Sequence, residues 1–272
     1  MLRVERVAGR EGDALTLLAR DPYENVFITY LLLFSASPTT LDSIFVALDA
    51  ANHVRGVAYF ARQVVVVGDR EAIDTFAQLA RSMRGERMIV GRRESVEIYW
   101  ERVRAWHPAP RHIRNHQPLL VLDRASLNRC AQHVTVRRAR MDEWPSVADS
   151  SAQMTQQELE YDPRQTWPQF TANVRKMIER ELWWVGESLG RLCFFCNVGP
   201  WSAQTMQLQG IWTPPELRGK GLATAAMSAI CDRLLNASPT LSLYVNDYNT
   251  PAINLYRRIG FTVVSEFQTL LF

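Results

Sequence analysis

The chain has almost no lysine. Lys176 and Lys220 are the only two in 272 residues, and the other basic residues are arginines. We interpret the preference for arginine as the codon bias of a GC-rich genome and not as a sign of nucleic-acid binding. A formal net charge of +3 is too small to indicate nucleic acid as a partner. Lys220 is notable because it lies between two glycines, in the stretch Arg218-Gly219-Lys220-Gly221.

Cysteine and histidine are also scarce, and their spacing argues against disulfides and metal sites. Cys193 and Cys196 form a CxxC in an expected strand, where positions three apart point to opposite faces. His112 and His116 have the spacing of a helical metal pair, but Pro118 follows and no acidic partner is placed, which favours a loop or a strand edge. We therefore expect a reducing environment and no metal.

No hydrophobic run is long enough to cross a membrane. The most apolar early run, residues 26–34, has about half the length that spans a bilayer. The first residues lack the apolar core and cleavage site of a signal peptide. With 47% hydrophobic residues the chain can still build an ordinary globular core. We expect a cytoplasmic protein with no membrane partner, and nothing in the sequence contradicts a homodimer.

The second half, residues 133–272, alternates between strand and helix patterns. The expected order is strand, two helices, hairpin, strand, helix, strand, helix and strand, which is a mixed α/β sheet. The hairpin should turn at residues 188–190, and Gly260 should end the last helix. Residues 261–272 contain no glycine, proline or asparagine for a turn. We therefore expect one long final strand there, bulged near Ser265 and Glu266.

The first half, residues 1–124, repeats this order. It begins with a helical stretch over residues 13–34, continues through strands and helices, and ends in an expected strand over residues 118–123. Its counterpart of the glycine turn reads Asp69-Arg70-Glu71. Carboxylates at a helix start would repel a phosphate that needed the same amides. We therefore predict two copies of one architecture, of which the first is degenerate and binds no cofactor at this turn.

The glycine turn has the chemistry of an anion site. The free N–H groups at a helix N-terminus, with the helix dipole behind them, attract anions. Glycine lets the backbone approach phosphates without a side chain in the way, and Arg218 and Lys220 add positive charge. The spacing is not that of a Walker turn. A strand, this turn and a helix together predict a pyrophosphate cradle.

Two sequence blocks resemble the GNAT superfamily of acyl-CoA-dependent N-acyltransferases. Residues 218–223, RGKGLA, match its R/Q-x-x-G-x-G/A signature, and residues 249–261 resemble its block N-x-x-A-x-x-L-Y-x-x-x-G-F. The resemblance covers about residues 134–272, while the first half matches only in element order. It implies tandem GNAT-like domains over residues 1–124 and 133–272, with a mixed, mostly antiparallel sheet, splayed central strands and flanking helices.

The resemblance also implies roles for individual residues. Acetyl-CoA would be held by Ile211, Trp212, Thr213, Arg218, Gly219, Lys220, Gly221, Leu222, Ala223, Thr224 and Asn249. Tyr256 matches the tyrosine that protonates the departing thiolate in the family. The simpler structural roles are a helix N-cap for Asn249, which can coexist with cofactor binding, and core packing for Tyr256.

The base that would accept the amine proton is harder to assign. Many GNAT relatives carry a glutamate on the fourth strand, but this chain has Gln207 and Gln209 there, and neither can be a base. The carboxylates that remain as candidates are Glu158, Glu160, Asp162 and the terminal carboxylate of Phe272. We favour Glu158, because the resemblance implies that such helices form one wall of the acceptor site.

The implied activity is transfer of an acetyl group to a primary amine of a small molecule or protein. Two alternatives stay open. One is an acyltransferase with another donor, or with a large acceptor between the halves, and the other is a non-catalytic acyl-CoA-binding regulator. A single strand after Gly260 also leaves the second half one strand short of a GNAT sheet. We predict that strands from the first half, such as residues 118–123, complete it.

Overall fold

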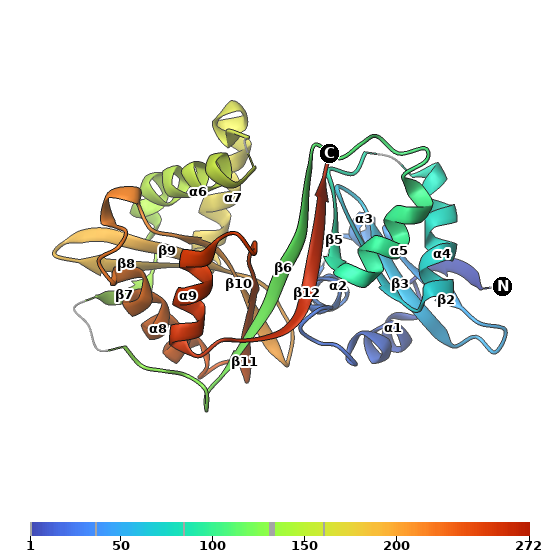
Figure 1. The fold of residues 1–272 in the computed structure, drawn as a ribbon, viewed down its shortest axis with the longest axis horizontal. Helices are drawn as coiled ribbons and strands as arrows, with labels where there is room; N and C mark the ends of the chain where they lie inside the picture. The colour runs from blue at the N-terminus through green and yellow to red at the C-terminus, as the bar shows by residue number, and fades with distance from the viewer. Residues whose placement is uncertain (1, 36, 84, 131–133, 160) are drawn as a thin grey trace.

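The computed structural model describes residues 2–35, 37–83, 85–130, 134–159 and 161–272 (Figure 1). The first half contains β1 (Arg3–Arg6), α1 (Glu11–Leu18), α2 (Val26–Phe34), α3 (Pro38–Leu41), β2 (Ile44–Leu48), β3 (Val54–Phe60), β4 (Gln63–Gly68), α4 (Arg70–Leu79), β5 (Met88–Arg92), α5 (Arg93–Val103) and β6 (His112–Asp123). The second half contains β7 (Thr135–Arg138), α6 (Trp144–Leu159), α7 (Trp167–Glu179), β8 (Trp183–Ser188), β9 (Arg191–Trp201), β10 (Thr205–Trp212), α8 (Leu222–Leu234), β11 (Thr240–Tyr244), α9 (Thr250–Ile259) and β12 (Thr262–Leu271).

All of these strands form one mixed sheet. Its order is β1-β2-β3-β4-β5-β12-β6-β11-β10-β9-β8-β7. The pairs β4–β5 and β10–β11 are parallel, and the other described pairs are antiparallel. The expected fold class, α/β with a mostly antiparallel sheet and flanking helices, is confirmed.

The two halves exchange strands at the centre of the sheet. β6 of the first half pairs with β11 of the second, and β12 of the second half pairs with β5 of the first. β6 and β12 also pair with each other, side by side between the halves (Figure 1). The prediction that a first-half strand completes the second-half sheet is therefore confirmed, and the exchange is reciprocal.

The final strand is a single element, as expected, but it bends at two places. Its register against β6 shifts between Val263 and Ser265 and again between Phe267 and Thr269. We expected one bulge near Ser265 and Glu266. Bulges increase the local bending and twist of a strand.

Two expectations for the first half were wrong in detail, and one short strand was not expected. The helical stretch over residues 13–34 is two helices, because Pro22 disfavours helical geometry at Asp21 and interrupts the run. β1 was not expected, since four residues carry little pattern. The strand expected over residues 118–123 begins at His112, because the residues before Pro118 pair with β12 as far as Leu271.

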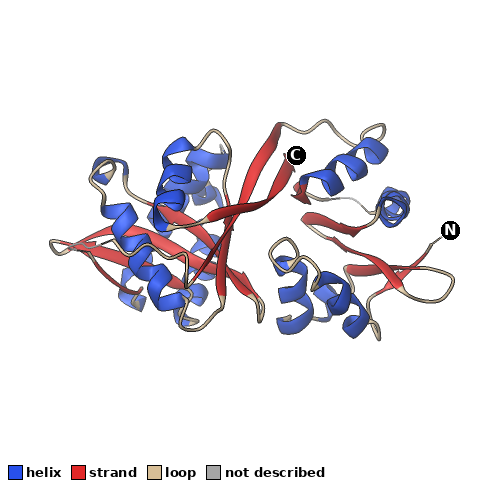
Figure 2. Ribbon diagram, turned by 60° about the horizontal axis from the view of Figure 1, so that its bottom comes forward, coloured by secondary structure: helices blue, strands red, loops and turns tan. Residues whose placement is uncertain are grey.

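Helices cover both faces of the sheet in each half (Figure 2). In the second half, α8 and α9 contribute to one buried apolar cluster and α6 and α7 to another, on the two faces of β8 and β9. In the first half, α4 and α5 contribute to one cluster and α1 and α2 to the other.

The two halves also touch outside the sheet. Tyr30 of α2 packs edge-on against Trp201 of β9, with ring centroids 4.5 Å apart. Arg93 of α5 donates to Glu266 of β12 at 3.0 Å, and His116 lies 2.9 Å from the same carboxylate. Hydrogen bonding by His116, and then by Arg93, holds the pKa of Glu266 below its usual range. Helix packing and charge pairing thus add to the shared strands.

Candidate acyl-CoA site

The parallel strands β10 and β11 separate part-way along their length. They pair only from Thr205 to Gln207, opposite Thr240 to Ser242. β10 continues to Trp212, and its register against β9 shifts between Gln209 and Trp212. The backbone of Leu208 to Trp212 therefore has no β11 partner, and this includes Ile211. The splayed central strands expected from the sequence are present, with unpaired peptide groups along the opening.

The glycine turn joins β10 to α8 and has the backbone geometry of an open cradle. Gly219 and Gly221 have φ of +74° and +77°, in the left-handed region that favours glycine. A Cβ added at either would meet nothing within 4 Å. Gly221 is the N-cap of α8 and supplies no side-chain hydrogen bond to it.

The first turn of α8 consequently has free donors. Its first residues are Leu222, Ala223 and the buried Thr224. The first N–H groups of a helix have no partner within the helix, and here no side chain caps them. Uncapped amides behind an open glycine turn can bind a pyrophosphate through the helix dipole and direct hydrogen bonds.

The cationic side chains of the turn are held by backbone carbonyls. Arg218 donates through Nε to the Thr213 carbonyl oxygen at 3.0 Å, and its guanidinium lies 4.4 Å from the centroid of the Trp212 ring. Lys220 Nζ donates to the carbonyl oxygen of Glu216 at 3.0 Å. Trp212 and Thr213 are buried, so the end of β10 forms a firm support for the turn.

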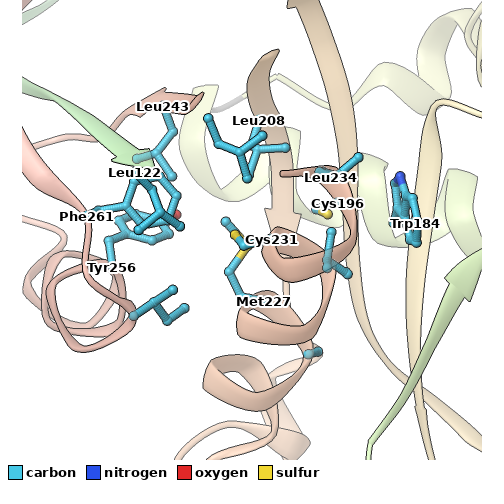
Figure 3. Packing of buried hydrophobic residues seen from close by; sticks show 14 of the residues in the cluster. Leu122, Trp184, Cys196, Leu208, Met227, Cys231, Leu234, Leu243, Tyr256 and Phe261 are labelled. Atoms are coloured by element: carbon cyan, nitrogen blue, oxygen red, sulfur yellow. The ribbon is translucent and has the colours of Figure 1, made fainter. Parts of the chain in front are cut away.

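The second sequence block forms α9, on the other side of the opening. Asn249 is the N-cap of this helix, and its Oδ1 accepts a hydrogen bond from Ala252 N at 3.3 Å. Tyr256 is buried beside Leu122 and Phe261 (Figure 3). Burial, and secondarily the charge of Glu158, raises the pKa of this tyrosine well above its ordinary value. The phenol therefore stays protonated at neutral pH, as a proton donor must.

Glu158, at the end of α6, faces the same region. Its side chain is open to solvent, yet surrounding protein desolvates the carboxylate, and this raises its pKa. Arg114 opposes the shift. Burial raises the pKa of Tyr244, at the end of β11, and of Tyr256, in α9, and the charge of Glu158 adds to both shifts. Residues with perturbed pKa values gather at functional sites, so Glu158 and Tyr256 are candidates for the base and the acid of one site.

Comparison with known proteins agrees with this geometry. A family model described as "Acetyltransferase (GNAT) family" matches residues 139–261, and a model of a domain of unknown function, DUF4081, matches residues 45–147. Residues 139–261 are a GNAT acetyltransferase domain. The glycine turn, Asn249 and Tyr256 all lie within it.

Individual relatives are distant. Mycothiol acetyltransferase of Acidimicrobium ferrooxidans is 37% identical over 99 residues, covering 32% of this chain and 32% of that protein. Thialysine N-epsilon-acetyltransferase of Mus musculus is 30% identical over 81 residues, covering 28% of this chain and 48% of that protein. The matches thus span about a third and about half of these relatives' own lengths.

A solved structure extends the likeness to the whole chain. A tandem GNAT protein from the clavulanic acid biosynthesis pathway matches with a TM-score of 0.58 and 14% identity, covering 100% of this chain and 98% of that one. At that identity the likeness concerns the fold alone. It supports a tandem arrangement of two GNAT-like halves.

Two of the remaining carboxylates considered from the sequence have other surroundings in the structure. Asp162 accepts from the backbone N–H of Arg164 at 2.9 Å and pairs with that arginine's side chain. Phe272 packs against Trp100 and His107 of the first half, so β12 carries the chain end away from Tyr256; that alternative was wrong. Glu160 lies outside the described residues.

Sequence reasoning missed Arg114. Its Nη2 donates to the backbone carbonyl of Glu158 at 2.6 Å, and its charge lowers the pKa of that glutamate. Arg114 lies on β6, the strand that the first half contributes to the centre of the sheet. No spacing in the sequence connects it with α6, because the contact exists only through the strand exchange.

The cysteines and histidines form no metal centre among the described residues. Cys193 and Cys196 are free and buried in the same apolar cluster, rather than on opposite faces. The register between β8 and β9 shifts at Gly186, and this bulge turns Cys193 toward the cluster. No described helix is long and apolar enough to cross a membrane.

Proposed function

We propose that this protein is an N-acetyltransferase that moves the acetyl group of acetyl-CoA to a primary amine. The observation that carries the proposal is the opening between β10 and β11, with an uncapped helix N-terminus on one side and Tyr256 on the other. Acetyl transfer requires an anion cradle for the cofactor and a proton donor for the leaving thiolate. A separate element of the GNAT domain supplies each of them.

Cofactor binding would use backbone groups for most of its contacts. The unpaired peptide groups of Ile211, Trp212 and Thr213 would bond the extended amide-bearing arm of acetyl-CoA. The pyrophosphate would be held by the turn and the first turn of α8, namely Arg218, Gly219, Lys220, Gly221, Leu222, Ala223 and Thr224. Asn249 would contact the cofactor near the thioester while it caps α9, because its Nδ2 is not used by the cap.

The chemistry then needs three proton transfers. Glu158, directly or through water, takes a proton from the acceptor ammonium, which frees the nitrogen lone pair. The nitrogen forms a bond to the thioester carbonyl carbon, and the carbon–sulfur bond breaks with its electron pair on sulfur. Tyr256 gives its proton to the thiolate. After bond formation the nitrogen carries a positive charge and a surplus proton, and this second proton passes to the tyrosinate and restores Tyr256. The acceptor ends as an amide, coenzyme A leaves as a thiol and the proton on Glu158 is released to solvent, so atoms and charge balance.

The acceptor that we favour is a small molecule. Both curated relatives carry names of acetyltransferases for small molecules, and one name specifies an ε-nitrogen. We also propose that residues 1–124 and 133–272 are the two evolutionary units, the first supporting the second, and that the protein acts in the cytoplasm.

A thiol-release assay tests the function. Acetyl-CoA is supplied with a panel of small amines and lysine-containing peptides, for the natural chain and for Glu158→Gln. We expect amine-dependent thiol release by the natural chain, and a loss on the order of 10²-fold in the variant, as for removal of a general base. Tight acetyl-CoA binding without thiol release for any amine would instead identify a regulatory acyl-CoA-binding module.

A further inference from the structure

The loop between β11 and α9 carries Asn249, and strand β6 of the first half holds this loop. The loop follows the last residues of β11 that pair with β6 and keeps bonding to the same strand. Val245 N donates to the carbonyl oxygen of Pro118 at 3.2 Å. Asp247 N donates to the carbonyl oxygen of His116 at 3.0 Å. The segment that leads to Asn249 therefore lies against a strand that belongs to the other half of the chain.

One side chain of β6 adds to these backbone contacts. Gln117 is only 1% exposed, and its Nε2 donates to Asn246 Oδ1 at 2.9 Å. Its Oε1 accepts from the hydroxyl of Thr269, on β12, at 2.6 Å. The backbone carbonyl oxygen of Asn246 in turn accepts from Asn249 N at 2.9 Å. A chain of hydrogen bonds thus runs from the central strands β6 and β12 to the N-cap of α9.

The surroundings of Gln117 are largely apolar. Leu119, two positions further along β6, is fully buried in an apolar cluster, and Phe267 of the same cluster is the β12 partner of Gln117. An apolar side chain would fill this place without the cost of taking an amide out of water. A fully bonded buried network instead favours one geometry, because other arrangements leave a polar group without a partner. Gln117 therefore specifies where the side chain of Asn246 lies.

The geometry of this loop reaches two residues of the acyl-CoA site. Asn249 caps α9, with its Oδ1 accepting from Ala252 N at 3.3 Å, and Tyr256 lies on the same helix. Asn246 precedes Asn249 by three positions and bonds its backbone. A shift of Asn246 therefore moves the start of the helix and the amide of its cap.

From these observations we propose that Gln117 is a positioning residue of the acetyl-CoA site, supplied by the first half. It holds Asn246, and through it Asn249, in the place from which the Asn249 amide contacts the cofactor. Thr269 orients Gln117 from the other side. The inference rests on the acetyl-CoA site proposed above. It gives the first half a part in cofactor binding that goes beyond completing the sheet.

A double-mutant cycle on acetyl-CoA binding tests the proposal. Calorimetry measures the dissociation constant Kd of acetyl-CoA for the natural chain, Gln117→Met, Asn249→Ala and the double variant. Methionine is unbranched like glutamine but has no amide. We expect each single variant to raise Kd about tenfold, as for the loss of one hydrogen bond. The double variant should bind no more weakly than Asn249→Ala, because Gln117 acts through Asn249.

Gln268→Met is the matched control. Gln268 is also buried between β12 and β6, and its Nε2 donates to Asn115 Oδ1 at 3.0 Å. Among the described residues, no hydrogen bond joins its side chain to the loop before α9, so Gln268→Met should leave Kd unchanged. Thr269→Val removes the hydroxyl on the other side of Gln117 and should raise Kd by a smaller factor. If Gln117→Met does not fold, the same cycle is run with Thr269→Val.

Steady-state kinetics separates positioning from a general loosening of the fold. Gln117→Met should raise the KM for acetyl-CoA and leave the KM for the amine unchanged. A variant that only reduces the folded fraction lowers the apparent kcat and leaves both KM values as they were.

Three results would each overturn the proposal: an unchanged Kd in either single variant, additive effects of Gln117→Met and Asn249→Ala, or an equal rise of Kd in Gln268→Met. The cycle measures binding alone. Its outcome is therefore distinct from a failure of the proposed acetyl transfer, which would appear as acetyl-CoA binding without thiol release in the natural chain.

Discussion

The two halves contain the same splayed pair of parallel strands, but their helix caps are inverted. In the GNAT domain, the helix after the first strand is uncapped at Gly221 and the helix after the second is capped by Asn249. In the first half, the former position is capped by Asp69 and the latter begins at the uncapped Arg92. The two openings therefore differ in which of their two helix starts has no side-chain cap.

The largest effect should come from giving the GNAT domain the cap of the first half. Gly221→Asp places a carboxylate where the pyrophosphate would bind, so we expect acetyl-CoA affinity to fall more than 100-fold, since a like charge must be desolvated against it. Calorimetry should show one site per chain in the natural protein and none in the variant.

Gly9→Asp is the control for backbone strain. Gly9 has φ of +79°, and an added Cβ meets nothing within 4 Å, as at Gly221. An equal loss of acetyl-CoA binding in both variants would show that charge at α8 is not the cause.

The next effect concerns two tyrosines at the same place in their helices. Tyr256 of α9 and Tyr99 of α5 each lie six residues after the first residue of the helix, and both are buried. Tyr256→Phe removes a proton donor and should lower kcat on the order of 10²-fold with little change in acetyl-CoA affinity. Tyr99→Phe should leave kcat unchanged. If the two variants lose activity equally, Tyr256 acts through packing.

The smallest effect tests how the first half acts on the GNAT domain. Desolvation raises the pKa of Glu158, and Arg114 lowers it. A base must be ionised, so activity should rise as pH increases through this pKa. Arg114→Leu removes the lowering influence, so the acidic limb of kcat/KM should move to higher pH, with a several-fold loss of rate at neutral pH. Arg114→Lys keeps the positive charge, so the acidic limb of kcat/KM should stay close to its position in the natural protein. If the acidic limb of kcat/KM does not move in Arg114→Leu, then ionisation of Glu158 does not control the rate.

Much of the GNAT domain could be predicted because its signals are local. The glycines at positions 219 and 221 require left-handed backbone, and Asn249 and Gly260 begin and end α9 as their residue types predict. The single strand after Gly260 followed from the absence of turn residues. The roles of the individual site residues in binding and catalysis stay predictions.

The features that could not be predicted depend on contacts between distant segments. Arg114 and Glu158 are 44 residues apart and meet only because β6 enters the other half. The Cys193 bulge likewise arises from strand register, which a simple two-residue alternation does not contain.

The position of β12 has a consequence for how the chain folds during synthesis. β12 follows every other strand in chain order, so it leaves the ribosome after them, yet it pairs with β5 and β6 at the middle of the sheet. Leu271 meets both Met88 and His112 across long loops, and such distant pairings form slowly. Until then β5 has an open edge that invites aggregation. The nascent first half must therefore wait for the second, and the two halves mature in one late step.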